Sequence, residues 1–201
     1  MTREAIRRYG AVVMAGGAIW GTGMLVAGPL GDDELHRAEL IGSFGWQLGI
    51  LALLAVMAAT RATGSGRFGR SLLAVETALV VLAMVWTVAH VFDPDMVDSG
   101  IMVALDAAWP LSMLVLLVVA VAVAVAHRWT GRARWAPMLA KLYVVVALLT
   151  LAVMPEWPGL IVRSLVLTTL FGWLGWVIVT DIASGRSLRD TAANPSVVSS
   201  I

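Results

Sequence analysis

Six long apolar segments separated by short polar loops constrain this chain more than any motif in it. The segments run at about 10–30, 39–60, 71–92, 101–126, 137–154 and 160–181, and each approaches the roughly 20 apolar residues that a helix needs to cross a bilayer. Backbone groups cannot remain unpaired in lipid, and continuous rather than alternating apolar runs disfavour a β-barrel. The sequence therefore predicts an all-α integral membrane protein, a six-transmembrane-helix bundle with no soluble domain.

The composition agrees with this class. Of the 201 residues, 60% are hydrophobic and 13% are charged, too few polar groups to cover a soluble domain of this size. Residues 1–183 are predicted to form the transmembrane domain, and the small, polar residues 184–201 a disordered cytoplasmic tail. The absence of cysteine excludes disulfides, thiolate nucleophiles and cysteine-ligated clusters.

Charged residues sort into alternate loops. One set of loops and ends holds Arg3, Arg7, Arg8, Arg61, Arg67, Arg70, Arg128, Arg132, Arg134, Arg186 and Arg189, with Lys141 beginning the fifth segment. The other set holds Asp32, Asp33, Glu34, Glu39, Asp93, Asp95, Asp98 and Glu156, with Arg37 and Arg163 as its basic residues. Cytoplasmic loops carry the excess of Lys and Arg. Both termini are therefore predicted to be cytoplasmic, in a multi-pass protein of the plasma (inner) membrane.

Two basic stretches, one at the N-terminus and one in a loop, each have two possible interpretations. The arginines before the first segment resemble the start of a signal peptide, but the apolar run to Leu30 exceeds the usual length of up to about 15 residues, so we expect a retained helix. The basic, Trp-containing stretch 127–135 is interpreted as a cytoplasmic loop with tryptophans at the headgroup level, and no nucleic-acid binding is predicted.

Glycines concentrate in the first two segments. The first contains a small-xxx-small pair at Gly17 and Gly21, and the second contains Gly42, Gly45 and Gly49. Missing side chains let helices approach closely in a membrane. The pattern predicts packing of the two segments against each other within one chain, while a homo-oligomer seam or a contact with a membrane-protein partner remains open.

Ionisable and aromatic side chains occur at one depth in four segments, toward the predicted outer side. They are Trp46, Gln47, Trp86, His90, Asp106, Trp109 and Arg163. Helical spacing aligns Trp86 with His90 and Asp106 with Trp109, and Pro110 would free a backbone carbonyl near Asp106. We interpret these residues as a Trp-walled, polar-ended ligand pocket open to the outside. Structural pairing of Asp106 with Arg163 or His90 is the alternative.

Two further polar groups are candidates for other roles. His90, Asp93 and His36 could supply imidazole and carboxylate ligands to a metal, but their spacing is unspecific and no resident metal is predicted. Glu76 and Lys141 lie at comparable depths toward the cytoplasmic side. An ion pair between them is favoured, with a proton-carrying Glu76 as the alternative.

No motif of a known catalytic site occurs in the sequence, so a non-enzyme without a cofactor is expected. The first hypothesis is receptor- or transporter-like binding of a small, largely apolar ligand in the outward-facing pocket. The first alternative is a non-catalytic accessory or assembly subunit of a larger membrane complex. The second alternative is an outer-side metal-binding or proton-coupled transporter. Glycine faces buried inside a bundle with an outer cavity would favour binding, whereas an exposed glycine face would favour the accessory subunit.

Overall fold

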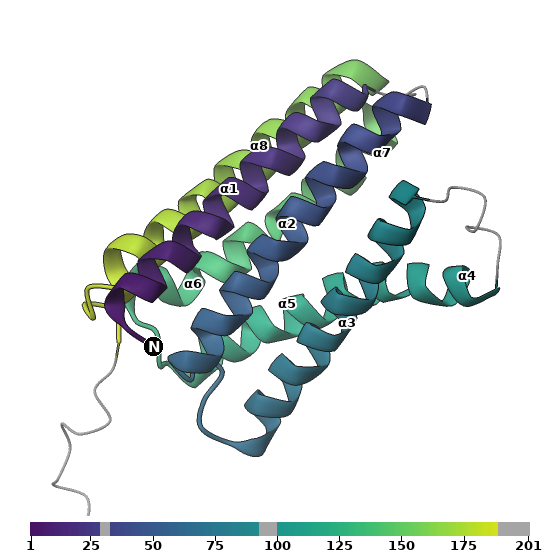
Figure 1. The fold of residues 1–201 in the computed structure, drawn as a ribbon. Coiled ribbons are helices and arrows are strands. Elements are labelled where there is room, and N and C mark those ends of the chain that lie inside the picture. The colour runs from purple at the N-terminus through teal and green to yellow at the C-terminus, as the bar shows by residue number, and fades with distance from the viewer. Residues whose placement is uncertain (29–32, 93–99, 189–201) are drawn as a thin grey trace, which may run out of the picture.

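Residues 1–28, 33–92 and 100–188 are described by a computed structural model of the chain. They form helices and no strand, and six spans are long and apolar enough to cross a membrane (Figure 1). The spans are Arg3–Ala27, Arg37–Ala59, Arg67–Phe92, Gly100–Ala126, Gly131–Val153 and Glu156–Ile182. The prediction of an all-helical chain with six potential transmembrane helices is thereby confirmed. The fifth span begins earlier than the predicted residue 137, because the helix extends past Trp135.

Three spans are single helices and three are interrupted. The continuous ones are α1 (Arg3–Ala27), α2 (Asp33–Ala59) and α3 (Arg67–Phe92). The fourth consists of α4 (Gly100–Asp106) and α5 (Ala108–Ala126), the fifth of α6 (Gly131–Ala140) and α7 (Leu142–Val153), and the sixth of α8 (Glu156–Val177) followed by the π-helical turn η2 (Ile178–Ile182). The regular α-helical backbone is thus interrupted once in each of these three spans.

The break between α4 and α5 has an identifiable cause. Pro110 lies in the first turn of α5 and has no N–H to donate to the carbonyl of Asp106, four residues earlier. The helix is interrupted at Ala107 as a result. The second break, at Lys141, is a tighter turn, because the Lys141 N–H bonds to the Met138 carbonyl and the Val144 N–H to the Lys141 carbonyl, both at 3.1 Å.

Helix α1 lies between α2 and α8 and packs closely on both (Figure 1). A Cβ atom added at Gly16 would lie 2.8 Å from the carbonyl oxygen of Gly45 in α2, and one at Gly17 would lie 2.6 Å from Cβ of Phe171 in α8. Gly21 faces Ser164 and Thr168 of α8 in the same way. The predicted α1–α2 packing is present, but the small-xxx-small pair packs on α8 of the same chain.

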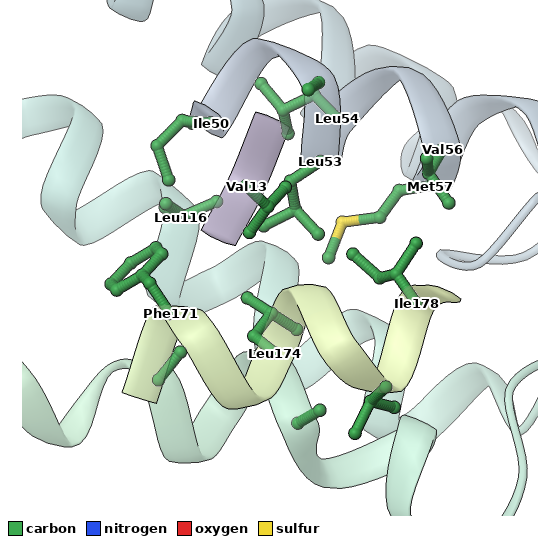
Figure 2. Packing of buried hydrophobic residues seen from close by; sticks show 14 of the residues in the cluster. Val13, Ile50, Leu53, Leu54, Val56, Met57, Leu116, Phe171, Leu174 and Ile178 are labelled. Carbon is green, nitrogen blue, oxygen red and sulfur yellow. The ribbon is translucent and has the colours of Figure 1, made fainter. Parts of the chain in front are cut away.

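The hydrophobic core lies where α1, α2, α5 and α8 meet (Figure 2). Its largest fully buried members include Val13, Ile50, Val56, Met57, Leu167, Leu174 and Ile178. Helix α3 packs on α2 and α5 at the edge of the bundle, and its span is the least buried of the six. This uneven packing matters for function, because the two cavities described below are both lined by α2 and α3.

Side chains from distant segments meet at one end of the bundle, the arginine-rich end formed by the start of α1, the α2–α3 and α5–α6 connections and η2. The Arg132 guanidinium donates to both carboxylate oxygens of Asp181, at 2.5 and 2.8 Å, and stacks over the Trp176 ring. The fully buried Trp129 donates its indole N–H to Thr60 at 3.0 Å. Leu188 pairs with Trp129 through a β-bridge, so ordered contacts continue past residue 184, where the sequence predicts the tail to begin. The remainder of that tail lies outside the described residues.

Candidate functional site

A cavity of about 190 Å³ lies between α1, α2 and α3, beside the break that separates α4 from α5. We call it the tryptophan pocket. Its lining residues are Trp20, Glu39, Leu40, Ser43, Gln47, Ala83, Trp86, Thr87, Leu105, Asp106 and Trp109. The pocket therefore combines aromatic walls from α1, α3 and α5 with polar groups from α2, α3 and the end of α4.

Four of the residues predicted to bind a ligand line this pocket: Gln47, Trp86, Asp106 and Trp109. Two others support the lining from behind. Trp46 is 2% exposed, and its ring centroid lies 4.9 Å from that of Trp20 and 5.2 Å from that of Trp109. The His90 ring packs against Trp86 with centroids 4.8 Å apart. These aromatic groups thus lie in or next to the lining of one cavity.

Arg163 is the predicted ligand-binding residue that the structure leaves away from the pocket lining. It lies on α8 near Gly159 and interacts electrostatically with the Tyr143 hydroxyl, as Glu39 also does. Tyr143 in turn packs its ring on Trp20 at 5.8 Å between centroids. The sequence puts Arg163 and Asp106 at a similar depth along their helices, but only Asp106 lines the pocket.

Trp20 is the aromatic lining residue that sequence reasoning missed. Its ring contacts those of Trp46, Trp109 and Tyr143 and so joins four helices. A Cβ atom at Gly42 would lie 3.1 Å from the Trp20 Cα, which shows how closely α2 approaches α1 at this level. The glycine spacing in the second segment is the sequence feature that could have identified Trp20, because a glycine facing a tryptophan on a neighbouring helix leaves room for its ring.

Gln47 has a fixed orientation at the base of the pocket. The side chain is 1% exposed and donates from its amide nitrogen to the Thr87 hydroxyl at 2.9 Å. Thr87 donates its own hydrogen to the Ala83 carbonyl at 2.9 Å and can therefore only accept from Gln47. The Gln47 carbonyl oxygen is left without a hydrogen-bond partner among the described residues. The pocket consequently offers a buried acceptor whose position is set by its neighbours.

The charged groups of the pocket have one sign. Glu39 and Asp106 supply carboxylates, and none of the described residues that line the pocket is basic. The Trp20 indole N–H is a buried donor without a partner in the described part of the chain. The Gln47 carbonyl oxygen and the Asp106 carboxylate thus lie between aromatic walls, and such surroundings suit a molecule that brings hydrogen-bond donors or a positive charge.

Glu76 and Lys141 form a second polar region inside the bundle. Glu76 is 0% exposed and accepts a hydrogen bond of 2.8 Å from the Ser112 hydroxyl. Its other carboxylate oxygen has no partner among the described residues. Lys141 is 8% exposed and directs its Nζ to the Met113 sulfur at 3.7 Å. The two charges interact electrostatically, but no direct ion pair joins them.

Of the weak metal candidates, only the His90 side chain lies in the part of the chain that the structure describes. No group of three or more His, Asp or Glu side chains there is arranged to hold an ion. Asp93 and the side chain of His36 lie outside the described part of the structure.

Comparison with protein-family models, with curated proteins and with solved structures gives no match to this chain.

Proposed function

We propose that this multi-pass membrane protein binds a small, largely apolar ligand with a positively charged, hydrogen-bond-donating end in the tryptophan pocket, as a receptor or transporter does. The observation that carries the proposal is the lining. Trp20, Trp86 and Trp109 provide aromatic walls, and Gln47 with Asp106 provides acceptors that no basic lining residue neutralises. Binding sites of this kind are concave, mostly apolar and equipped with a few fixed polar groups.

The size of the cavity limits the ligand. Its volume of about 190 Å³ is below the roughly 300–1,000 Å³ that holds drug-sized molecules. Aromatic faces attract cations, most strongly where water is excluded. A short alkyl or aryl ammonium ion fits both the volume and the charge. We place the pocket toward the outer leaflet of the plasma membrane, and the support for its side is the charge rule, because the pocket lies away from the arginine-rich end.

The glycine faces favour ligand binding over an accessory-subunit role. Gly16 and Gly23 are buried against α2, and Gly17 and Gly21 against α8. These faces are already used inside the chain, and a cavity lies next to them. This is the arrangement expected of a self-contained binding bundle.

The test compares three probes of equal length that differ in their polar end: hexylammonium, hexanol and hexanoate. The purified protein in nanodiscs is titrated with each, and binding is followed by tryptophan fluorescence and by thermal unfolding. We expect saturable binding of hexylammonium, at least about tenfold weaker binding of hexanol, and none of hexanoate, since a hydrogen bond to a charged group contributes about 1.5–3 kcal/mol. Asp106→Asn and Gln47→Leu should each weaken hexylammonium binding about tenfold.

Arg163→Gln is the control, because Arg163 is also predicted from the sequence to bind the ligand but does not line the pocket. It should bind hexylammonium as the wild type does. Equal affinity for all three probes would contradict the proposal. A loss of binding in Arg163→Gln as large as that in Asp106→Asn would show that the ligand lies elsewhere in the bundle.

A further inference from the structure

A second and larger cavity lies between α2 and α3 at the arginine-rich end. This inner groove has a volume of about 770 Å³ and shares no lining residue with the tryptophan pocket. Its lining residues are Leu51, Leu54, Ala55, Ala58, Arg61, Thr63, Gly64, Ser65, Arg70, Leu73, Ala74 and Thr77. The groove forms where the loosely packed α3 turns away from α2, and its volume falls in the range of ligand sites.

The groove is apolar along its length and basic at one end. Its α3 wall runs from Arg70 to Thr77, about 10 Å at the rise of a helix. Leucines and alanines of both helices line this stretch. Arg61 and Arg70 line the basic end of the groove. Arg128 also reaches this end and donates to the Ser65 hydroxyl at 3.4 Å. None of the described lining residues is acidic, so the groove matches an anion attached to an apolar chain.

Arg61 occupies a backbone position that usually belongs to glycine. It ends α2 with φ of 52°, in the left-handed region. The Ala62 N–H bonds to the Met57 carbonyl at 2.8 Å and the Arg61 N–H to the Ala58 carbonyl at 3.2 Å, which is the Schellman pattern of helix ends. Non-glycine residues in this conformation gather at functional sites. Here the strained position directs an arginine side chain to the groove.

We infer that the inner groove binds one anionic phospholipid of the cytoplasmic leaflet. The headgroup phosphate pairs with Arg61 and Arg70, and an acyl chain lies between α2 and α3 along Leu54 and Leu73. Basic pockets between membrane-spanning helices on the cytoplasmic side bind anionic headgroups, and the arginine-rich end is the one that the charge rule assigns to the cytoplasm. The inference uses no residue of the tryptophan pocket and does not depend on the function proposed for it.

Native mass spectrometry of the protein in mild detergent tests this assignment. Phosphatidylglycerol and phosphatidylcholine with identical acyl chains are added at matched concentrations, and bound lipids are counted. We expect one phosphatidylglycerol retained with at least tenfold higher affinity than phosphatidylcholine. Equal retention of the two lipids would overturn the inference, because the groove would then accept any bilayer lipid.

Three variants separate the headgroup site from the groove. Arg61→Gly removes a guanidinium where the backbone already suits glycine, and Arg70→Gln removes the other. The pair should reduce phosphatidylglycerol binding to the level of phosphatidylcholine. Ala74→Phe fills the groove without changing charge and should abolish retention of both lipids.

Arg7→Gln is the control, since this exposed arginine belongs to the same end but does not line the groove. It should leave the preference intact. A loss of preference in Arg7→Gln equal to that in the Arg61→Gly, Arg70→Gln pair would refute a specific site and point to general attraction by the basic end. Unchanged lipid retention in Ala74→Phe would equally refute the groove.

Discussion

Glu76 is a buried carboxylate with one of its two oxygens hydrogen-bonded. Ser112 donates a hydrogen bond to one oxygen, whereas the ammonium group of Lys141 lies against the Met113 sulfur and not against the carboxylate. A charge inside a membrane bundle needs compensation. Because no direct ion pair joins Glu76 and Lys141, we expect any compensation between them to act through the low-dielectric interior, where electrostatic interactions extend further than in water.

A double-mutant cycle tests this long-range compensation. Glu76→Gln and Lys141→Met each leave the remaining buried charge without its opposite, so each should lower the free energy of unfolding. The double variant should recover part of the loss, with a coupling energy of about 0.5–3 kcal/mol. Denaturant titration in a single detergent measures all four proteins. Strictly additive effects would show that the two charges act independently, and the exposed Glu156→Gln serves as the control.

At the scale of the elements, α1 owes its position to glycines on two faces. A side chain at Gly16 would meet backbone atoms of α2, which cannot rotate aside as the end of a flexible side chain can. Gly172, in α8, has no atom within 4 Å of an added Cβ. The two positions therefore give a matched pair of helical glycines, one buried between helices and one in open space.

Gly16→Ala should destabilise the protein by about 1–3 kcal/mol, the usual cost of forcing extra volume into a packed interior. It should also change tryptophan fluorescence, because Trp46 lies directly opposite. Gly172→Ala should raise stability by up to about 1 kcal/mol, since alanine favours helix more than glycine does. Thermal unfolding of both variants provides the measurement. Equal effects at the two sites would contradict the packing described for α1.

The helices were predictable from the sequence because a transmembrane span is a local property. An apolar run of sufficient length forms a helix whatever its neighbours are, and Pro110 breaks its own helix. The neighbours of each helix were less predictable. Depth in the membrane can be counted along the chain, which brought Gln47 and Asp106 together correctly. Rotation about the helix axis depends on distant partners, so Trp20 was missed and Arg163 was included.

At the scale of the whole molecule, the orientation in the membrane is a prediction from charge alone. The chain has no cysteine, so single cysteines can be introduced into an otherwise unreactive background. Gly66 and Glu156 are exposed and lie in or beside turns at opposite ends of the bundle. With the arginine-rich end in the cytoplasm, Glu156→Cys should react with a membrane-impermeant maleimide in intact cells.

Gly66→Cys should react with the same reagent only after the membrane is opened. The two variants control for each other, because each must become labelled under one of the two conditions. Labelling of Gly66→Cys in intact cells, together with protection of Glu156→Cys, would reverse the orientation. The tryptophan pocket would then belong to the cytoplasmic side, and the inner groove to the outer leaflet.

The pairing of α1 with α8 also sets the order in which the helices of the bundle can pack during synthesis. The Thr168 hydroxyl bonds to the carbonyl of Gly17, 151 positions earlier in the chain. At a synthesis rate of about 5–20 residues per second, roughly 8–30 s separate the translation of these two partners. Helix α2 can pack on α1 soon after it is made. The α1 face that carries Gly17 and Gly21 must contact lipid or the insertion machinery until α8 has been synthesised. The α1–α8 interface therefore forms only after the sixth span has been made, and a chain that stops before α8 keeps its first five spans but leaves the glycine face of α1 uncovered.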